Sequence, residues 1–486
     1  MSECNPTKAE EKLEFYRKIN KEIVNDRVSF FKCFDLHKSE TQKFNYKSIY
    51  EEWMMYMGEL SRIERKDALS LYIHVPFCAA KCNFCCYDSV SFNKELVPKY
   101  LDYINEEVRL FAPITRQEKF DTIYFGGGTP NILNHKELEV LFKTIFENFQ
   151  ATDNPELKAE CNPNFSDLEK LKIFREYRFN RLSFGVQSFD KDVLCKAKRP
   201  YQTDEKVLSA INDAEKLGFE DVNMDIMFGL EGDNTDKFLN SIKKAFQSNV
   251  GNIIIYKLMP TPLYYREFLL KESLGPDSPE KEVFSRIYDL KKVFFEMAKL
   301  ADKYDYKYNK DELNYSGTNM GIGFKRADLA RNFDFDKKNY SFYVDYPMSC
   351  LGLGSFSMSH IFGRAFYKNM NKEMFFDTEQ NIYTGNRIEL GAEILQDMAN
   401  QIENTNLIDL GVLNNKYSMN LLKMYSKQLA DLLELKLINI KDKKIYINEE
   451  MIKLTELLLF FTDIQHLRLL NRQKNIISKP PDYAKN

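Results

Sequence analysis

Four of the nine cysteines lie between Cys78 and Cys86, and three of these follow the spacing CxxxCxxC. Cys78, Cys82 and Cys85 stand on a loop short enough to wrap one metal centre. A structural zinc site takes four ligands, usually as two separated pairs, and the chain has no second pair; His74 or Cys86 could still serve as the fourth. Three cysteines also suit a four-iron, four-sulfur cluster that keeps one iron open for a ligand, because full ligation takes four.

Other residues that could bind a ligand or take part in catalysis follow apolar runs elsewhere in the chain. Residues 126–130 read GGGTP, Glu160 and Gln187 follow later runs, and Asp225 interrupts an apolar one. A glycine loop lets backbone amides approach a ligand, and a following helix N-terminus favours a carboxylate; a tight turn is the simpler reading. Glu160 is either a ligand contact or a helix cap. Asp225 needs a partner if buried, so we interpret it as a site residue.

The elements that must position these residues alternate between strand and helix. Apolar runs predict strands at 71–75, 121–125, 156–160, 180–184, 221–227 and 252–258, and helical periods predict helices at 94–112, 135–149, 167–178, 204–217 and 235–248. This order indicates parallel βαβ units, arranged as an open doubly wound sheet or as a full or partial barrel. In either layout, ligands bind at the carboxyl ends of the strands. The unusual residues stand at those ends.

The chain divides by pattern into three parts. Residues 1–70 are charged and helical in pattern and are predicted to form an N-terminal extension, residues 71–387 the α/β domain with a long helix at 279–304, and residues 388–486 a C-terminal helical domain and tail. In the last part, helices precede two β-like runs and a helix at 449–462, an order similar to a winged helix. Such modules often bind DNA, but no dense basic recognition helix is present, so we do not predict nucleic-acid binding.

Composition excludes several classes of protein. The 486 residues are 44% hydrophobic and 29% charged, which is globular composition. The formal charge of −3 provides no overall positive field for nucleic acid or membranes. No apolar run of membrane-spanning length and no secretory signal are read, so a cytoplasmic protein is expected. In a reducing compartment, crowded cysteines indicate metal ligation rather than disulfides.

The cysteine spacing, with Phe84 before the third cysteine, resembles the signature of the radical S-adenosylmethionine (SAM) superfamily. Five further segments resemble the oxygen-independent coproporphyrinogen III dehydrogenase family: LYIHVPFC at 71–78, FGGGTP at 125–130, NRLSFGVQSF at 180–189, NMDIMFGL at 223–230 and YKLMP at 256–260. The resemblance covers about 70–370. It implies an α/β fold, a partial (β/α)6 TIM-like barrel with a C-terminal winged-helix-like domain.

The resemblance also implies roles for individual residues. Cys78, Cys82 and Cys85 would bind a 4Fe-4S cluster whose open iron chelates the amino and carboxylate groups of SAM. Around that SAM, the methionine moiety would be bordered by Gly126, Gly127, Gly128 and Thr129, with Tyr72 and Glu160 in contact. A second SAM would be bound by Phe84, Gln187, Arg199 and Asp225, and Phe356 would pack near adenosine.

The chain departs from both well-defined branches of the family. The dehydrogenases carry Cys-Gly-Cys where this chain has Cys85-Cys86, and an early Arg-Tyr-Thr-Ser-Tyr-Pro segment is missing from residues 1–70. The His-Asn pair of the haem-chaperone branch is missing near 309–345. His360 is either a proton donor or a hydrogen-bonded loop histidine. Four of the six cysteines outside the motif, Cys86, Cys161, Cys195 and Cys350, are predicted to be small buried hydrophobes, with a chemical role left open for Cys86.

These patterns predict a radical SAM enzyme. An external donor such as flavodoxin or ferredoxin would supply an electron, SAM would be cleaved to a 5'-deoxyadenosyl radical, and the radical would abstract hydrogen from a substrate. We expect a tetrapyrrole-related substrate, or methyl transfer if a second SAM is used. The alternatives are a haem carrier of the same family with little turnover and a zinc-stabilised transcription factor. No particular catalytic residue is identified from the sequence.

Overall fold

The computed structural model describes residues 7–25, 42–61, 68–258, 284–285, 287–308, 321–329, 348–380, 382–388, 390–405, 407–448 and 454–461. Within these ranges the main feature is a mixed sheet of 13 strands in the order β1-β15-β14-β13-β12-β2-β5-β6-β7-β8-β9-β11-β10.

Six consecutive parallel strands form the centre of this sheet. They are β2 (Ala68–Val75), β5 (Lys119–Gly127), β6 (Gln150–Cys161), β7 (Arg181–Gln187), β8 (Asp221–Phe228) and β9 (Asn252–Lys257). All six were predicted. Each strand neighbours the next one along the chain, and right-handed crossovers then place all connecting helices on the same face. This is barrel-type order; a doubly wound sheet would reverse its strand order.

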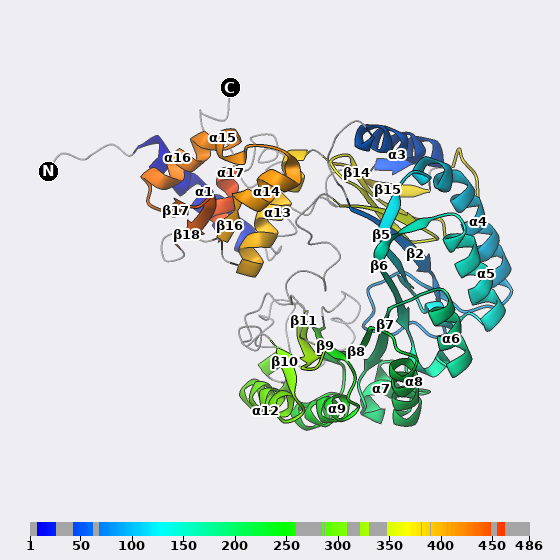
Figure 1. The fold of residues 1–486 in the computed structure, drawn as a ribbon. Coiled ribbons are helices and arrows are strands. Elements are labelled where there is room, and N and C mark those ends of the chain that lie inside the picture. Colours follow the sequence, from blue (N-terminus) through cyan, green and yellow to red (C-terminus); the bar gives the residue numbers. More distant parts are fainter. Residues whose placement is uncertain are drawn as a thin grey trace.

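The connecting helices lie along the outer face of the curved sheet (Figure 1). They are α4 (Leu96–Thr115), α5 (His135–Phe146), α6 (Leu168–Glu176), α8 (Asp204–Lys216) and α9 (Thr235–Gln247), close to their predicted bounds. One helix differs. The pattern predicted a single helix over 279–304, of which residues 279–283 and 286 lie outside the described ranges. Residues 288 and 289 are not helical, and α12 (Leu290–Lys303) begins after Asp289, whose backbone is extended and whose carboxylate accepts the Lys292 N–H at 3.1 Å.

Further strands extend the sheet at both edges, all of them antiparallel to their neighbours except β12. On the β2 side, β12 (Met348–Leu353) pairs in parallel with β2 and is followed by β13 (Met358–Ile361), β14 (Ala365–Asn369), β15 (Tyr383–Arg387) and β1 (Gln42–Phe44). On the β9 side lie β11 (Gly321–Arg326) and β10 (Tyr306–Tyr308). Neither extension was predicted strand by strand.

The N-terminal helices contact two different parts of the molecule. Helix α1 (Lys8–Asn25) packs on α17 (Leu454–Phe461), where the rings of Tyr16 and Phe460 are 4.9 Å apart. Helix α3 (Tyr46–Leu60) instead packs on α4, and Trp53 donates from Nε1 to the Tyr367 hydroxyl at 2.6 Å. The domain boundaries drawn at 70 and 387 remain a prediction.

The C-terminal part contains helices α13 (Leu390–Thr405), α14 (Leu410–Tyr417), α15 (Leu421–Met424) and α16 (Ser426–Glu434) before the hairpin of β17 (Ile438–Lys441) and β18 (Lys444–Ile447). A short strand, β16 (Leu407–Asp409), pairs with β18. Stacked rings of Phe362 and Tyr417, 5.5 Å apart, join this part to the sheet extension. The winged-helix comparison stays a prediction. None of the helices in the described ranges has the length and apolar composition of a membrane span.

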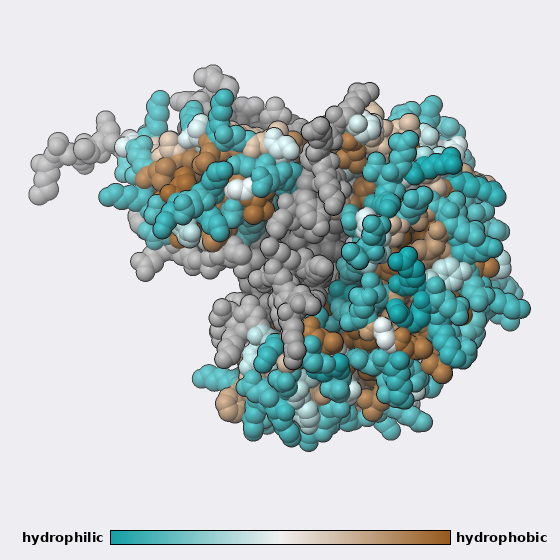
Figure 2. Space-filling model, viewed as in Figure 1, coloured by the Kyte–Doolittle hydropathy of each residue, from teal (hydrophilic) through white to brown (hydrophobic). Residues whose placement is uncertain are grey.

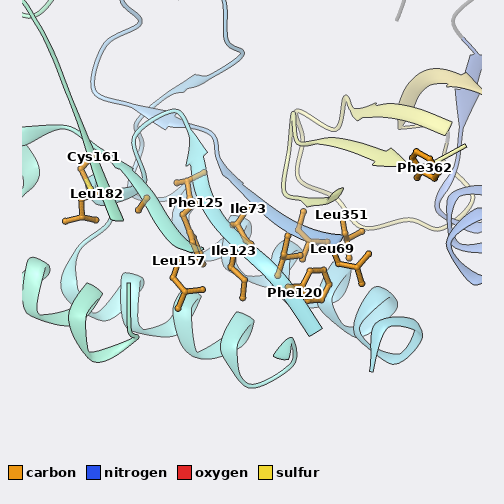
Figure 3. Close-up of a cluster of buried hydrophobic side chains, with 14 of the residues drawn as sticks. Leu69, Ile73, Phe120, Ile123, Phe125, Leu157, Cys161, Leu182, Leu351 and Phe362 are labelled. Atoms are coloured by element: carbon orange, nitrogen blue, oxygen red, sulfur yellow. The ribbon is translucent and has the colours of Figure 1, made fainter. Parts of the chain in front are cut away.

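Side chains of the central strands alternate between two environments. On the outer face, residues such as Ile73, Ile123, Phe125 and Leu157 are buried beneath the helices (Figure 3). The outward sides of the helices are mainly hydrophilic in Figure 2. The hydrophobic core therefore lies between the sheet and the helices, which leaves the inner face of the sheet for other side chains.

A buried carboxylate connects the barrel to its extension. Glu107 of α4 has no exposed surface, and burial raises its pKa. Its Oε2 accepts the Gly354 N–H at 2.6 Å, and its Oε1 accepts hydrogen bonds of 2.8 to 3.3 Å from Tyr46, Tyr103, Asn369 and Tyr383. These partners come from α3, α4, β14, β15 and the turn after β12, so a single side chain joins five segments.

We expect Glu107→Ala to destabilise the protein by about 3–5 kcal/mol, because several buried donors lose their acceptor together. The neighbouring Glu106→Ala removes a carboxylate paired with Arg109 on the exposed side of the helix and should cost less than about 1 kcal/mol. Chemical denaturation of both variants measures the difference. Equal losses would contradict the role assigned to Glu107.

Candidate metal and cofactor site

Polar side chains gather on the inner face of the central strands. The strand register places Tyr72, Tyr124, Lys158, Arg181 and Asp221 side by side in one row. One step toward the carboxyl ends, a second row contains Glu160, Ser183 and Asn223. We refer to these two rows, with His74 and Asp225, as the polar inner face.

The cysteine loop is fixed at the carboxyl ends of β2 and β5. Cys78 ends the short strand β3 (Phe77–Cys78), which pairs with β4 (Val90–Ser91). The N–H of Gly128 donates to the Val75 carbonyl at 2.8 Å, and the Thr129 hydroxyl lies 3.8 Å from the Cys78 sulfur. The predicted cluster loop and the predicted glycine loop are therefore in contact.

The environment of the three thiols suits a positively charged metal centre. Burial raises the pKa of Cys78 and raises that of Cys85 to about 11, so their thiolates need a nearby cation. Arg199 donates from Nε to the Cys82 sulfur at 3.2 Å. Among the described residues, no three His, Cys, Asp or Glu side chains converge to hold a single ion. Cysteine ligands of an iron–sulfur cluster bind different iron atoms and need not converge on one point.

Two of the four cysteines that were predicted to be buried outside the motif are exposed. Cys161 is buried and Cys350 is partly buried, but Cys86 and Cys195 are exposed. Prediction of all four as buried hydrophobes was wrong for these two. Cys86 follows a cluster-loop cysteine, and Cys195 lies on a short surface helix, so neither contributes to the core.

The glycine loop is packed against protein rather than left open at its Cα positions. A Cβ on Gly126 would lie 3.1 Å from the Tyr72 ring, and one on Gly128 would lie 2.6 Å from the Phe77 carbonyl oxygen. Gly127 has a φ of +101°, and a Cβ there would lie 2.6 Å from the His74 ring. Close packing therefore requires glycine at positions 127 and 128 and leaves little room for a Cβ at 126.

Glu160 lies at the centre of the polar inner face. Its Oε2 accepts the Gly127 N–H at 3.2 Å, and its Oε1 accepts a hydrogen bond from the Tyr124 hydroxyl. Burial raises the pKa of Glu160. The structure thus places Glu160 against the glycine loop and adds Tyr124 to the predicted set, while contact of Glu160 with SAM stays a prediction.

A histidine orients the Tyr72 hydroxyl. His74 Nε2 lies 3.2 Å from the Asp88 carbonyl oxygen and Nδ1 lies 3.0 Å from the Tyr72 hydroxyl. Because a carbonyl only accepts, Nε2 carries the proton and Nδ1 accepts from Tyr72. Burial lowers the His74 pKa to about 4, so the ring is neutral. Both nitrogens are engaged, which argues against His74 as the zinc ligand considered above.

Three of the residues predicted to bind a second SAM lie close together around Gly185. Arg199 donates to the Gly185 carbonyl, and a Cβ on Gly185 would lie 3.0 Å from Gln187 Nε2. Asp225 is the register partner of Gly185 and accepts hydrogen bonds from Ser183 at 2.8 Å and Asn223 at 2.6 Å. Burial raises the Asp225 pKa to about 6.

One buried polar atom in this group lacks a partner. Asn223 Oδ1 has no hydrogen bond within the described part of the chain, although its Nδ2 is bonded. Such an atom is costly unless water or a ligand satisfies it. The polar inner face therefore has acceptor capacity left over, as a ligand-binding surface needs.

Phe84 and Phe356 differ in their surroundings. Phe84 is partly buried on the cysteine loop, whereas Phe356 is 3% exposed and meets His74 with ring centroids 6.0 Å apart. Phe356 thus packs against the ring of the neutral His74. His360 lies in β13 rather than on a loop, and its side chain pairs with Glu393 of α13.

The sequence reasoning missed several members of the polar inner face. Tyr124, Lys158, Arg181, Ser183 and Asn223 were counted only as parts of strands. A signal was available: these strands alternate polar and apolar residues, whereas parallel strands buried on both faces are apolar throughout. Reading that alternation would have found the second face.

Comparison with known proteins agrees with this geometry. Residues 72–245 match the Radical SAM superfamily. The oxygen-independent coproporphyrinogen III oxidases of Synechocystis sp. and Escherichia coli are 29% identical over 320 residues and 27% identical over 332, alignments that cover 64% and 68% of this chain and 66% and 69% of theirs. The heme chaperone HemW of Bacillus subtilis is 33% identical over 219 residues, 44% of this chain and 58% of the chaperone.

The fold has a match among solved structures. Coproporphyrinogen III oxidase (HemN) from Escherichia coli superposes with a TM-score of 0.64 at 22% identity, covering 87% of this chain and 96% of that one. The family match therefore assigns residues 72–245 of this chain to the radical SAM superfamily. Within it, the relatives named above are oxygen-independent coproporphyrinogen III oxidases and heme chaperones.

We expect Gly128→Ala to weaken the join between the glycine loop and the cysteine loop, because the new Cβ would meet the Phe77 backbone. The variant should lose at least about 1 kcal/mol of stability and reconstitute with less iron. Gly58→Ala, in α3 with nothing within 4 Å of the added carbon, should be neutral or stabilising. Iron retention equal to the parent would contradict the packing argument.

The raised Asp225 pKa predicts a pH-dependent stability difference. Since the folded-state pKa of about 6 exceeds the ordinary value of 3.8, ionised Asp225 weakens the fold as pH rises through about 6. Asp225→Asn should therefore gain about 1–3 kcal/mol over the parent between pH 4 and 7 in denaturation curves. The side chain of Asp192 is 81% exposed, so the free energy of unfolding of Asp192→Asn should differ from that of the parent by the same amount at every pH in this range. A pH-independent difference for Asp225→Asn would refute the role assigned to Asp225.

The assignment of the cluster ligands predicts opposite results for two neighbouring cysteines. Cys82→Ala should abolish iron incorporation, whereas Cys86→Ala should retain the parent's iron and sulfide content, because Cys86 is exposed outside the three-thiol set. Iron and sulfide analysis after anaerobic reconstitution measures both. Loss of iron in Cys86→Ala would overturn the ligand assignment.

Proposed function

We propose that this protein is a radical SAM enzyme in which Cys78, Cys82 and Cys85 hold a 4Fe-4S cluster. The observation that carries the proposal is the position of the cysteine loop, which touches the glycine loop beside the polar inner face. When bound, the cluster and SAM would supply the one-electron chemistry that generates a 5'-deoxyadenosyl radical for hydrogen abstraction. The protein binds, orients and shields the reacting groups.

The chain's own residues suit the binding of SAM. The Tyr72 hydroxyl donates a hydrogen bond to His74, so its oxygen is left to accept a hydrogen bond from a ligand amino group. Glu160 is a second acceptor beside the glycine loop. Asp225, with a pKa of about 6, can hold or release a proton at its carboxylate near neutral pH.

For the substrate, we propose a tetrapyrrole-related molecule. The similarity to oxygen-independent coproporphyrinogen III oxidases, over about two thirds of their length, supports this choice. The alternative reaction is methyl transfer with a second SAM, which is supported by the grouping of Gln187, Arg199 and Asp225 around Gly185. A small electron-transfer protein such as flavodoxin or ferredoxin would supply the electron.

A haem carrier is the second candidate. The similarity to the heme chaperone HemW supports it, as does the exposed thiol of Cys86 beside the cluster loop, because thiolate is a known haem ligand. In this alternative the same fold would hold haem with little turnover.

An anaerobic product assay separates these functions. The reconstituted protein is given dithionite and SAM, with and without coproporphyrinogen III, and 5'-deoxyadenosine and S-adenosylhomocysteine are measured by mass spectrometry. We expect 5'-deoxyadenosine, increased by the substrate and absent in Cys82→Ala.

Both products together would indicate methyl transfer. Neither product, combined with stoichiometric haem binding that Cys86→Ala weakens, would contradict the enzyme proposal in favour of the carrier. Stoichiometric zinc without iron would contradict both.

A further inference from the structure

Arg199 forms an unusual contact with one of the three motif cysteines. Its Nε lies 3.2 Å from the Cys82 sulfur, while its Nη1 donates to the Gly185 carbonyl and, at 3.4 Å, to Gln202 Oε1. In the described part of the chain, no carboxylate forms an ion pair with Arg199. By contrast, Arg181 of the polar inner face forms ion pairs with Glu156 and Asp221. The positive charge of Arg199 is therefore directed at sulfur.

The backbone holds Arg199 in this position. Helix α7 (Lys191–Lys196) ends in a turn in which Lys198 is left-handed, with a φ of +61°. The Arg199 N–H donates back to Leu194 at 2.7 Å, which is the pattern of a Schellman cap. Asn83 of the cysteine loop donates to the Lys196 carbonyl at 2.9 Å. Two contacts thus join this turn to the loop that carries Cys82.

A cation that donates to a cluster sulfur affects the cluster's electron affinity. One-electron reduction adds negative charge, part of which resides on the cysteine sulfurs, and a charge-assisted N–H bond stabilises that state more than the oxidised one. We infer that Arg199 tunes the proposed cluster, raising its reduction potential through the Nε–H···Sγ contact with Cys82. The inference rests on the proposed function because it requires the cluster. It assigns Arg199 a task that exists without a second SAM.

The test is a redox titration of the SAM-free, reconstituted full-length protein, followed by electron paramagnetic resonance. Arg199→Gln removes the charge and should make reduction at least about tenfold less favourable, a negative shift of about 59 mV for one electron. Arg199→Lys keeps a charge but not the Nε donor, so its potential should fall between the two. Lys198→Gln removes an exposed charge one residue away and should leave the potential unchanged.

Iron and sulfide content, measured for each protein, separates the possible failures. A parent without a cluster would refute the proposed function itself. A cluster in the parent and an Arg199→Gln potential equal to that of the parent, or to that of Lys198→Gln, would overturn the tuning role alone. If Arg199→Gln does not retain the cluster, Arg199→Lys decides: a lower potential supports the inference and an unchanged one refutes it.

Discussion

The rest of this structure depends on the order of its six central parallel strands, in which each strand lies beside the next one along the chain. Right-handed crossovers then place every connecting helix on the same side of the sheet. The apolar half of each strand is buried under those helices, and the other half faces inward with its counterparts from neighbouring strands. The polar inner face and the loops at the carboxyl ends follow directly from this one-sided burial.

Buried hydrogen bonds and packing contacts next to the predicted cofactor site hold its side chains and loops in place. Neutral His74 joins the Tyr72 hydroxyl to the backbone of Asp88, close to the cysteine loop. Glu107 fixes the turn after β12 that leads to Phe356, which in turn packs on His74. The glycine loop fits because three residues without Cβ atoms let β5 approach β2 and Phe77. The predicted cofactor site is therefore supported by buried interactions before any ligand binds.

The same scaffold is compatible with the two activities found among the chain's relatives. An oxygen-independent coproporphyrinogen III oxidase aligns with this chain over 320 residues and the heme chaperone HemW of Bacillus subtilis over 219, so similarity to either relative does not by itself distinguish the two activities. Near the site, this chain has the adjacent thiols of Cys85 and Cys86 and the contact of Arg199 with Cys82. The experiments proposed above test these features directly, because the fold alone is compatible with both activities.

Local patterns were sufficient to predict the six central strands, the helices between them and the cysteine motif, because hydrophobic period and residue spacing are properties of adjacent residues. They did not decide between a barrel and a doubly wound sheet, which depends on strand order. They also missed the break before α12, the exposure of Cys86 and Cys195, and the partners of Glu160 and Asp225. Contacts such as Arg199 with Cys82 join residues more than 100 positions apart. Only the folded chain brings such pairs together, because no local pattern encodes which distant strands and loops become neighbours.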